Sequence, residues 1–256
     1  MSILRPDWLT ARPIAHRGLH DRGKGVIENS ASAARAAIES QYAIECDVQM
    51  SSDGEAMVFH DETLDRLTTA KGRVDERSAG ELSNIVLRGG GDGIMTLMDF
   101  LDLINDSVAL IIEIKSEFSG DMRLADRTGQ LASAYDGPLA LKSFDPAIMA
   151  HLRMHRERLG IAHVPLGMVA EAHYDHAEWN FLGTAQKQSL AHFLHWQETQ
   201  PDFLSYGVRD LPHAVPHLLR SALGLPVMTW TVRTPEQRET AGRWADQIIF
   251  EGWRPE

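Results

Sequence analysis

The strongest constraint on the fold is an alternation of short apolar runs with longer amphipathic stretches along the whole chain. Alternating strand and helix signals of this kind are typical of α/β folds with a parallel sheet. Eight runs are expected to be parallel strands, and eight such strands can close a TIM-type (β/α)8 barrel. A doubly wound open sheet is the alternative. The eight expected strands cover residues 13–16, 42–50, 108–114, 139–144, 166–170, 203–206, 227–232 and 248–251.

Helical patterns occupy most of the intervals between these strands. Asn29 or Ser30 can cap the first helix, which is expected to end near Ser40. Further helices are expected at 146–159, 184–199, 212–223 and 235–244, three of which begin with a proline, a residue that the first helical turn tolerates.

A ninth apolar run, residues 56–60, follows the turn signal at 51–54 and is expected to return as the second arm of a hairpin. Residues 51–107 then form a small insertion after the second barrel strand. The chain has 256 residues, a length that one α/β barrel commonly reaches. Because no linker-like segment divides the sequence, we predict a single domain over residues 1–256.

Composition limits the partners. Lys and Arg number 25 against 36 Asp and Glu, a net charge of −11, whereas nucleic-acid binding depends on cations that neutralise phosphates. The single cysteine, Cys46, excludes an internal disulfide and suits a reducing compartment. No apolar run approaches the roughly 18 residues of a membrane helix, and charges interrupt the N-terminal residues where a signal peptide is apolar. We expect a cytoplasmic protein without an integral membrane segment; its oligomeric state stays open.

Two carboxylates share one face of the second expected strand. Residues two apart on a strand project to the same side, so Glu45 and Asp47 lie opposite Ile44, Cys46 and Val48. The apolar face of a barrel strand packs under helices, which turns both carboxylates inward near the mouth. Adjacent buried carboxylates repel each other, and a divalent cation would relieve that repulsion.

Glu113 repeats this pattern on the following barrel strand, two residues before Lys115. Three carboxylates with few other ligands suit Mg²⁺ or Ca²⁺, which prefer oxygen, and Mn²⁺ is a further candidate. The alternative for such residues is the polar face of a solvent-exposed strand.

Two histidines are expected at the same end of the sheet. His16 ends the first strand, and the hairpin returns His60 to the level of Asp47. Imidazole ordinarily titrates near neutral pH, so this pair could act as general acid and general base. Arg17 and Lys115 could bind a phosphate there, or could pair with the nearby acids.

Seven short motifs, spread in order over nearly the whole chain, connect these residues to a known family. They are Ile14-Ala15-His16-Arg17-Gly18, Glu28-Asn29-Ser30, Glu45-Cys46-Asp47-Val48-Gln49, Val58 to Thr68, Ile112-Glu113-Ile114-Lys115, Ser143-Phe144-Asp145 and Thr229-Trp230-Thr231-Val232. The combined set resembles the glycerophosphodiester phosphodiesterase family.

The resemblance implies a TIM-type barrel with a small insertion, and metal-dependent hydrolysis of glycerophosphodiesters to glycerol phosphate and an alcohol. It implies one divalent cation, Mg²⁺ or Ca²⁺, held by Glu45, Asp47 and Glu113. It assigns the acid–base roles to His16 and His60. The small-molecule diester would be the main partner.

The same resemblance makes Arg17 and Lys115 the phosphate-binding cations. It places the motif residues Glu28, Asn29, Phe144 and Trp230 in the substrate pocket, although Trp230 also suits a barrel core. The last strand departs from the family pattern, reading Ile249 to Trp253 where a Thr-Asp pair followed by proline is usual. Residues 171–200 match no motif.

Two other functions fit the same residues. A lysophospholipase D-type enzyme would act on a lipid, and an exposed apolar rim would favour it, but no strong apolar surface stretch is visible in the sequence. A non-catalytic phosphodiester-binding protein would bind its ligand without turnover, which the intact histidine pair and three acids disfavour.

Overall fold

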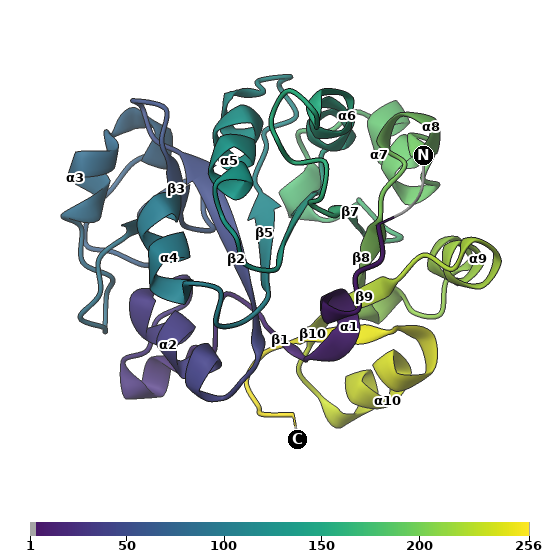
Figure 1. The fold of residues 1–256 in the computed structure, drawn as a ribbon, viewed down its shortest axis with the longest axis horizontal. Helices are drawn as coiled ribbons and strands as arrows, with labels where there is room; N and C mark the ends of the chain where they lie inside the picture. The colour runs from purple at the N-terminus through teal and green to yellow at the C-terminus, as the bar shows by residue number, and fades with distance from the viewer. Residues whose placement is uncertain (1–3, 256) are drawn as a thin grey trace.

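Eight parallel strands close into a barrel (Figure 1) in the computed structural model, which describes residues 4–255. Strand β1 pairs with β10 on one side and with β2 on the other, which closes the ring. This closure excludes the doubly wound open sheet. Around the barrel the strands are β1 (Ile14–Ala15), β2 (Ala43–Met50), β5 (Leu110–Ile114), β6 (Leu139–Ser143), β7 (Leu166–Ala170), β8 (Phe203–Gly207), β9 (Val227–Val232) and β10 (Gln247–Phe250).

Helices connect successive strands and cover the outside of the barrel (Figure 1). A short helix α1 (Trp8–Ala11) precedes the first strand. The connecting helices are α2 (Ala31–Glu39), α4 (Leu97–Ile104), α5 (Arg123–Ser133), α6 (Pro146–His155), α7 (Thr184–Ala191), α8 (Trp196–Thr199), α9 (Ala214–Leu223) and α10 (Pro235–Trp244).

Capping residues fix where several of these helices begin. The Ser30 hydroxyl accepts a hydrogen bond from the backbone of Ala33, so Ser30 rather than Asn29 caps α2. Asp145 caps α6 and places Pro146 at its first turn, where proline fits. Both starts agree with the sequence-based expectation.

Three predicted helices differ from the observed ones. The helix predicted at 146–159 ends four residues early, at His155. The helix predicted at 184–199 is broken, because Phe193 takes a left-handed backbone conformation with φ of 58° between α7 and α8. The helix predicted from Pro212 starts at Ala214 instead, because the extended residue His213 is its N-cap. Strand ends are shifted by one or two residues at several places, as β5 shows by starting at Leu110.

The two faces of the barrel strands pack differently. Ile44, Cys46 and Val48 of β2 are buried in the main apolar cluster together with helix residues, as the alternation predicts. Inside the barrel, the end at which the strands begin is filled by apolar side chains from several strands, which are Ile14, Ala43, Ile111, Ala140, Phe203, Met228 and Ile249. The polar side chains therefore gather at the other end, where the strands finish.

The insertion is a small lobe on the side of the barrel, left in Figure 1. Its strand β3 (Ala56–Val58) runs antiparallel to β2, with Val48 opposite Val58, and pairs on its other side with β4 (Met95–Thr96), again antiparallel. It also contains α3 (Ala79–Ser83). β3 ends two residues earlier than predicted, although Phe59 still donates a hydrogen bond to Asp47 O at 3.0 Å. The lobe has an apolar cluster of its own, which includes Met57, Phe59, Leu64, Leu67, Val74, Leu82 and Ile94.

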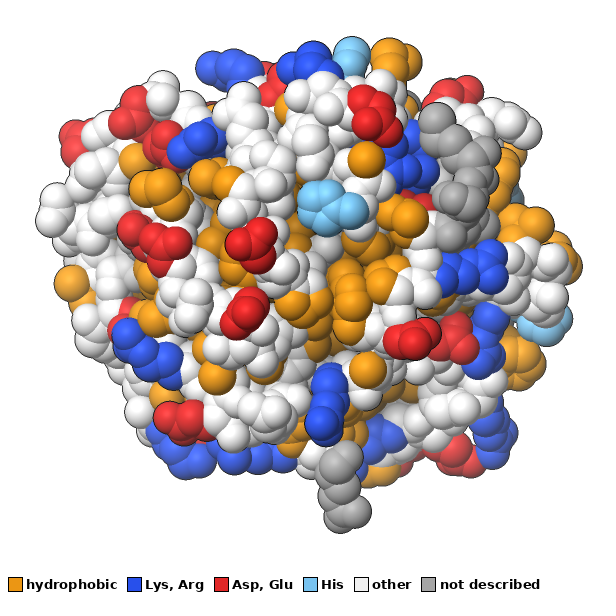
Figure 2. Space-filling model, in the orientation of Figure 1, with side chains coloured by type: hydrophobic (Ala, Val, Ile, Leu, Met, Phe, Trp, Pro, Cys, Tyr) orange, Lys and Arg blue, Asp and Glu red, His pale blue; other side chains and the backbone are white. Residues whose placement is uncertain are grey.

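The face of the molecule in Figure 2 carries acidic and basic side chains interspersed among apolar ones. A continuous positive surface of the kind that tracks a nucleic-acid backbone does not occupy this face. Within residues 4–255, no helix has both the length and the apolarity needed to traverse a bilayer.

Candidate active site

The strand ends open into a cleft of about 1110 Å³. Eight of the eleven residues proposed from the sequence line it, namely His16, Arg17, Asp47, His60, Glu113, Lys115, Phe144 and Trp230. Glu45 is 1% exposed and lies beneath the cleft. Glu28 and Asn29, expected in the substrate pocket, do not line it; they contact Arg17 and Asp47 from behind its wall.

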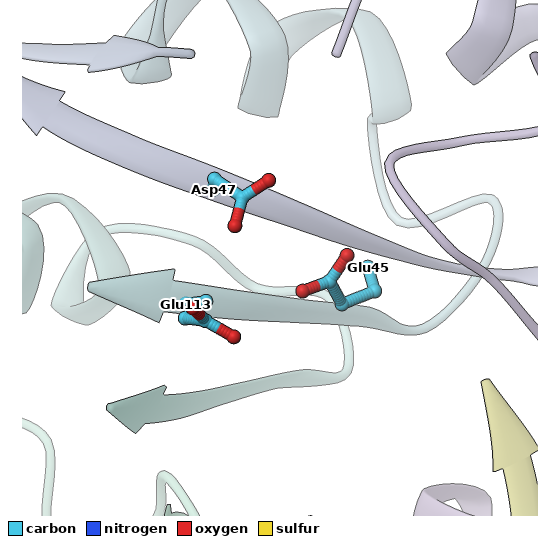
Figure 3. A group of neighbouring side chains, drawn as sticks. All are labelled: Glu45, Asp47 and Glu113. Carbon is cyan, nitrogen blue, oxygen red and sulfur yellow. The ribbon is translucent and has the colours of Figure 1, made fainter. Parts of the chain in front are cut away.

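The three acids form one compact group (Figure 3). Glu45 and Asp47 come from β2 and Glu113 from the neighbouring β5, whose register sets Asp47 directly beside Glu113. Each acid offers a carboxylate oxygen, and these oxygens all lie within 4.8 Å of one another. All three side chains are buried.

Two lysines compensate the charge of this group. Lys115 Nζ lies 2.8 Å from Asp47 Oδ1 and also pairs with Glu113 Oε1. Lys142, from β6, is 2% exposed, and its Nζ lies 3.0 Å from both Glu45 Oε1 and Glu113 Oε2. The β5–β6 register, with Glu113 opposite Lys142, produces this contact. Carboxylates can be buried together here because cations from adjacent strands face them.

The pKa values follow from this compensation. Burial raises the pKa of the Asp47 carboxyl, but the charges of Lys115, His60 and Arg17 outweigh burial and hold that pKa well below its usual range. Burial likewise raises the pKa of Glu113, and Lys115 together with Lys142 lowers it overall. Asp47 and Glu113 are therefore ionised near neutral pH, as ligands of a cation must be.

Arg17 enters the site through an unusual backbone turn. It has a φ of 55°, and its backbone N–H donates to Glu45 Oε2 at 3.1 Å. Gly18 follows with a φ of 79°, and a Cβ at this glycine would lie 2.9 Å from Ala33 Cβ. The turn therefore requires glycine for both its conformation and its close approach to α2.

Asn29 and Glu28 hold this turn against β2. Asn29 Nδ2 donates to Asp47 Oδ2 at 2.9 Å, and Asn29 Oδ1 accepts from the Asp47 backbone N–H at 3.2 Å. Glu28 Oε1 accepts from Arg17 at 2.6 Å. Burial alone would raise the pKa of Glu28, but hydrogen bonds from Arg66 and Arg17 lower it to about 2. Both residues position Arg17 and Asp47.

His16 and His60 each have a carboxylate on one ring nitrogen. His16 Nδ1 lies 2.8 Å from Glu251 Oε2, and Glu251 also pairs with Arg233. Burial raises the pKa of Glu251, whereas its contacts with His16 and Arg233 lower it below the ordinary range. Glu251 lies in the segment that departs from the family pattern, and it supplies the carboxylate behind His16.

His60 has the equivalent arrangement from the insertion. Its Nδ1 lies 2.8 Å from Asp61 Oδ1. Arg66 donates to Asp61 and also to both oxygens of Glu28, which ties the insertion to the loop before α2. Burial raises the pKa of Asp61, and the hydrogen bonds from His60 and Arg66 bring it below its ordinary value.

The donor set of the acids fits a hard divalent cation. Three carboxylates are the oxygen ligands that such ions prefer. Glu45 Oε1 is buried and accepts no hydrogen bond within residues 4–255, although Lys142 Nζ is 3.0 Å away. An oxygen ligand not already used by a hydrogen bond is what a metal site provides, so Glu45, Asp47 and Glu113 could hold a metal ion.

Several residues of the site were not singled out from the sequence. Lys142 stands in an apolar strand, and only the β5–β6 register reveals that it lies opposite Glu113. Glu251 could have been found from the pairing of β1 with β10, which sets Ala15 beside Phe250 and hence His16 beside Glu251. Asp61, although part of a quoted motif, was given no role. Trp179 belongs to the unmatched segment 171–200, and nothing in its sequence marks it.

Comparison with known proteins identifies the family. A sequence model described as "Glycerophosphoryl diester phosphodiesterase family" matches residues 16–251. The chain belongs to this family. A glycerophosphodiester phosphodiesterase of Caldanaerobacter subterraneus subsp. tengcongensis is 39% identical over 111 residues, which is 40% of this chain and 44% of that relative. The match therefore spans less than half the length of this curated relative.

Solved structures of related proteins share the fold. A phosphodiesterase of Oleispira antarctica, in complex with the product sn-glycerol-3-phosphate, superposes with a TM-score of 0.73 at 18% identity, covering 94% of both chains. A glycerophosphodiester phosphodiesterase of Thermotoga maritima gives a TM-score of 0.68 at 23% identity, over 93% of this chain and 92% of that one. The barrel architecture predicted from the sequence is thus confirmed.

Proposed function

We propose that the protein hydrolyses glycerophosphodiesters to glycerol phosphate and an alcohol, by acid–base catalysis with two histidines. One observation carries the proposal. His16 and His60, each with its Nδ1 on a carboxylate, line the same cleft as Asp47 and Glu113. Family membership and the glycerol phosphate bound by the Oleispira antarctica relative support the substrate class.

The carboxylates set the tautomer of both rings. An Nδ1–H that donates to Glu251 or to Asp61 leaves Nε2 of the same ring to exchange a proton with the substrate. One histidine then accepts the proton of the attacking oxygen, which belongs to water or to a neighbouring substrate hydroxyl. The other gives a proton to the leaving alcohol oxygen.

The cations of the cleft would neutralise the phosphoryl group. Arg17 and Lys115 line the cleft, and both lie beside Asp47 at its base. Arginine offers a forked donor pair that matches phosphate oxygens. We assign a divalent cation, Mg²⁺ or Ca²⁺ with Mn²⁺ as a further candidate, to Glu45, Asp47 and Glu113. When bound, such an ion supplies further positive charge for the phosphoryl oxygens.

The test is metal-dependent release of glycerol phosphate. Purified protein is stripped with EDTA, supplied with Mg²⁺, Ca²⁺ or Mn²⁺, and given a panel of glycerophosphodiesters and a lysophospholipid. His16→Ala and His60→Ala should each lower turnover by about 10²–10⁴-fold. His192→Ala is the matched control, because His192 is exposed and lies outside the lining of the cleft. Near-wild-type turnover of either cleft variant under saturating metal refutes that histidine's role.

The same assay separates the alternatives. Formation of lysophosphatidate and the free head-group alcohol from the lysophospholipid, with no glycerol phosphate released from the diesters, would identify a lysophospholipase D-type enzyme. The aromatic side chains in the cleft would favour it by contacting the acyl chain on the glycerol. Ligand binding without turnover with any metal would identify a non-catalytic binding protein. The cytoplasmic location stays a prediction, supported by the single, buried thiol of Cys46.

A further inference from the structure

A row of aromatic side chains leads from the centre of the cleft to its edge. Trp230 on β9 contacts Phe144 after β6, with ring centroids 5.5 Å apart, and Phe144 contacts Trp179 at 5.0 Å. Trp179 in turn lies 6.1 Å from both Phe118 and Phe181. We call these five residues the aromatic row. All five line the cleft that contains the two histidines.

The aromatic row has no spare hydrogen-bond donor. Trp179 is only 8% exposed and packs in an apolar cluster with Tyr174, Leu182 and Leu190, so the other four members offer most of the free ring surface. The indole N–H of Trp230 donates to Ser205 O at 3.0 Å, and that of Trp179 donates to Glu171. The remaining members are phenylalanines. A hydroxyl group placed against this row would find no partner on the rings themselves and would have to reach Glu171 or His176 beside Trp179, whereas an apolar body would gain contact along the whole row.

The row is also longer than a glycerol unit needs. The three carbons of glycerol can cover one ring such as Trp230, yet the contacts continue through Phe144 and Trp179 to Phe181. Phe181, at the outer end, is 56% exposed and lines the cleft, so the apolar wall continues to the edge. The cleft volume of about 1110 Å³ exceeds what a small diester fills.

We propose that the aromatic row binds the leaving alcohol, and that the preferred substrates are glycerophosphodiesters whose alcohol has an extended apolar body. This inference rests on the proposed function and adds the class of leaving group to it. The oxygen of water or of a neighbouring substrate hydroxyl gives its proton to one histidine as it bonds to phosphorus, the bond from phosphorus to the alcohol oxygen breaks, and the alcohol departs with the proton given by the other histidine. A polar alcohol would use the same catalytic groups without contact along the row.

A series of sn-glycero-3-phospho-n-alkanols from ethanol to octanol tests this inference. A fully buried methylene contributes about fourfold in binding, so a chain lying against one wall should gain about twofold per carbon in kcat/KM. The gain should appear mainly in KM, since the chain contacts the row before and during the reaction. Glycerophosphocholine, assayed in parallel, reports on recognition of a cationic alcohol by the same rings.

Variants locate the effect. Phe181→Ala should flatten the dependence on chain length, so that its deficit grows with each added carbon, and Phe181→Leu should restore most of the slope. Leu194→Ala is the matched control, because Leu194 is an exposed apolar residue outside the cleft lining. It should leave the slope unchanged.

The possible results separate this inference from the proposed function. Turnover of the short diesters with a flat or falling dependence on chain length overturns the inference and leaves the proposed function standing. A preference for glycerophosphocholine over every alkanol also overturns it, in favour of a cationic alcohol. If no diester yields glycerol phosphate, both are overturned. A rising slope that Phe181→Ala removes and Leu194→Ala preserves supports the row as the site of the leaving alcohol.

Discussion

Replacing Lys142 by methionine should destabilise the protein strongly in the absence of divalent ions. Lys142 Nζ is the buried cation between Glu45 and Glu113, at 3.0 Å from each. Methionine has a similar length and no charge, so it fills the space but leaves Glu45 without its facing cation. Removing one partner of a buried ion pair costs about 3–5 kcal/mol.

This cost converts to a change in melting temperature. Unfolding entropy is about 2.1 cal/mol/K per residue, so for 256 residues a loss of 3–5 kcal/mol lowers Tm by about 6–9 °C. The measurement is thermal unfolding in EDTA, followed by circular dichroism. Lys24→Met is the control, since Lys24 makes an exposed pair with Asp21, and its Tm should change by less than about 2 °C.

Divalent ions should act differently on the two proteins. A cation bound by the three acids replaces charge that Lys142→Met has lost, so the variant should gain more in Tm from added Mg²⁺ or Mn²⁺ than the wild type does. Two results would refute this reasoning. One is a variant that melts within about 2 °C of the wild type in EDTA, and the other is a larger metal-induced rise in the wild type.

Three further changes have expected outcomes. Glu251→Gln removes the carboxylate behind His16 and should lower turnover at least about tenfold, which a steady-state assay at a temperature where the variant is folded checks. Unchanged turnover would contradict it. Because the pKa of Glu28 is lowered from about 4.5 to about 2, the ionised side chain stabilises the fold above about pH 4.5, and this stabilisation is lost as the pH falls towards about 2. Glu28→Gln should therefore show a shallower fall of Tm than the wild type between these pH values. Parallel curves of Tm against pH would contradict this. Gly18→Ala should lose roughly 1–3 kcal/mol in denaturant unfolding, because its Cβ meets Ala33 at a positive φ; a change within about 0.5 kcal/mol would show that the turn relaxes.

The barrel was predictable because its signals are local. Alternation within β2 is enough to separate Glu45 and Asp47 from Ile44, Cys46 and Val48, and the structure confirms that separation. The prediction of one helix over 184–199 was wrong because the helix is broken by a left-handed backbone conformation at Phe193. Phenylalanine has no preference for that conformation, so the sequence gives no sign of the break.

The contacts between strands were harder to foresee. Lys142 meets Glu113 through the pairing of β6 with β5, and Glu251 meets His16 through the pairing of β10 with β1. The sequence alone does not show which residues lie opposite each other in these strand pairs. Glu28 and Asn29 were expected to contact substrate, but their side chains turn towards Arg17 and Asp47 because the loop before α2 passes behind the cleft.

His16 and His60 stand on different parts of the molecule. His16 follows strand β1 of the barrel, whereas His60 follows the hairpin of the insertion. Part of the insertion has its own apolar cluster, although Ala56 and Val58 of the hairpin pack in the main cluster of the barrel. Arg66 pairs with Asp61 within the insertion and with Glu28 in the loop before α2, so the Arg66–Glu28 pair joins the two parts. A local opening of the insertion that breaks the Arg66–Glu28 pair would move His60, a proposed proton-transfer group, away from His16. Under the proposed function, mutations that stabilise the barrel alone would therefore not secure the pairing of His16 with His60, and the insertion would have to be stabilised as well.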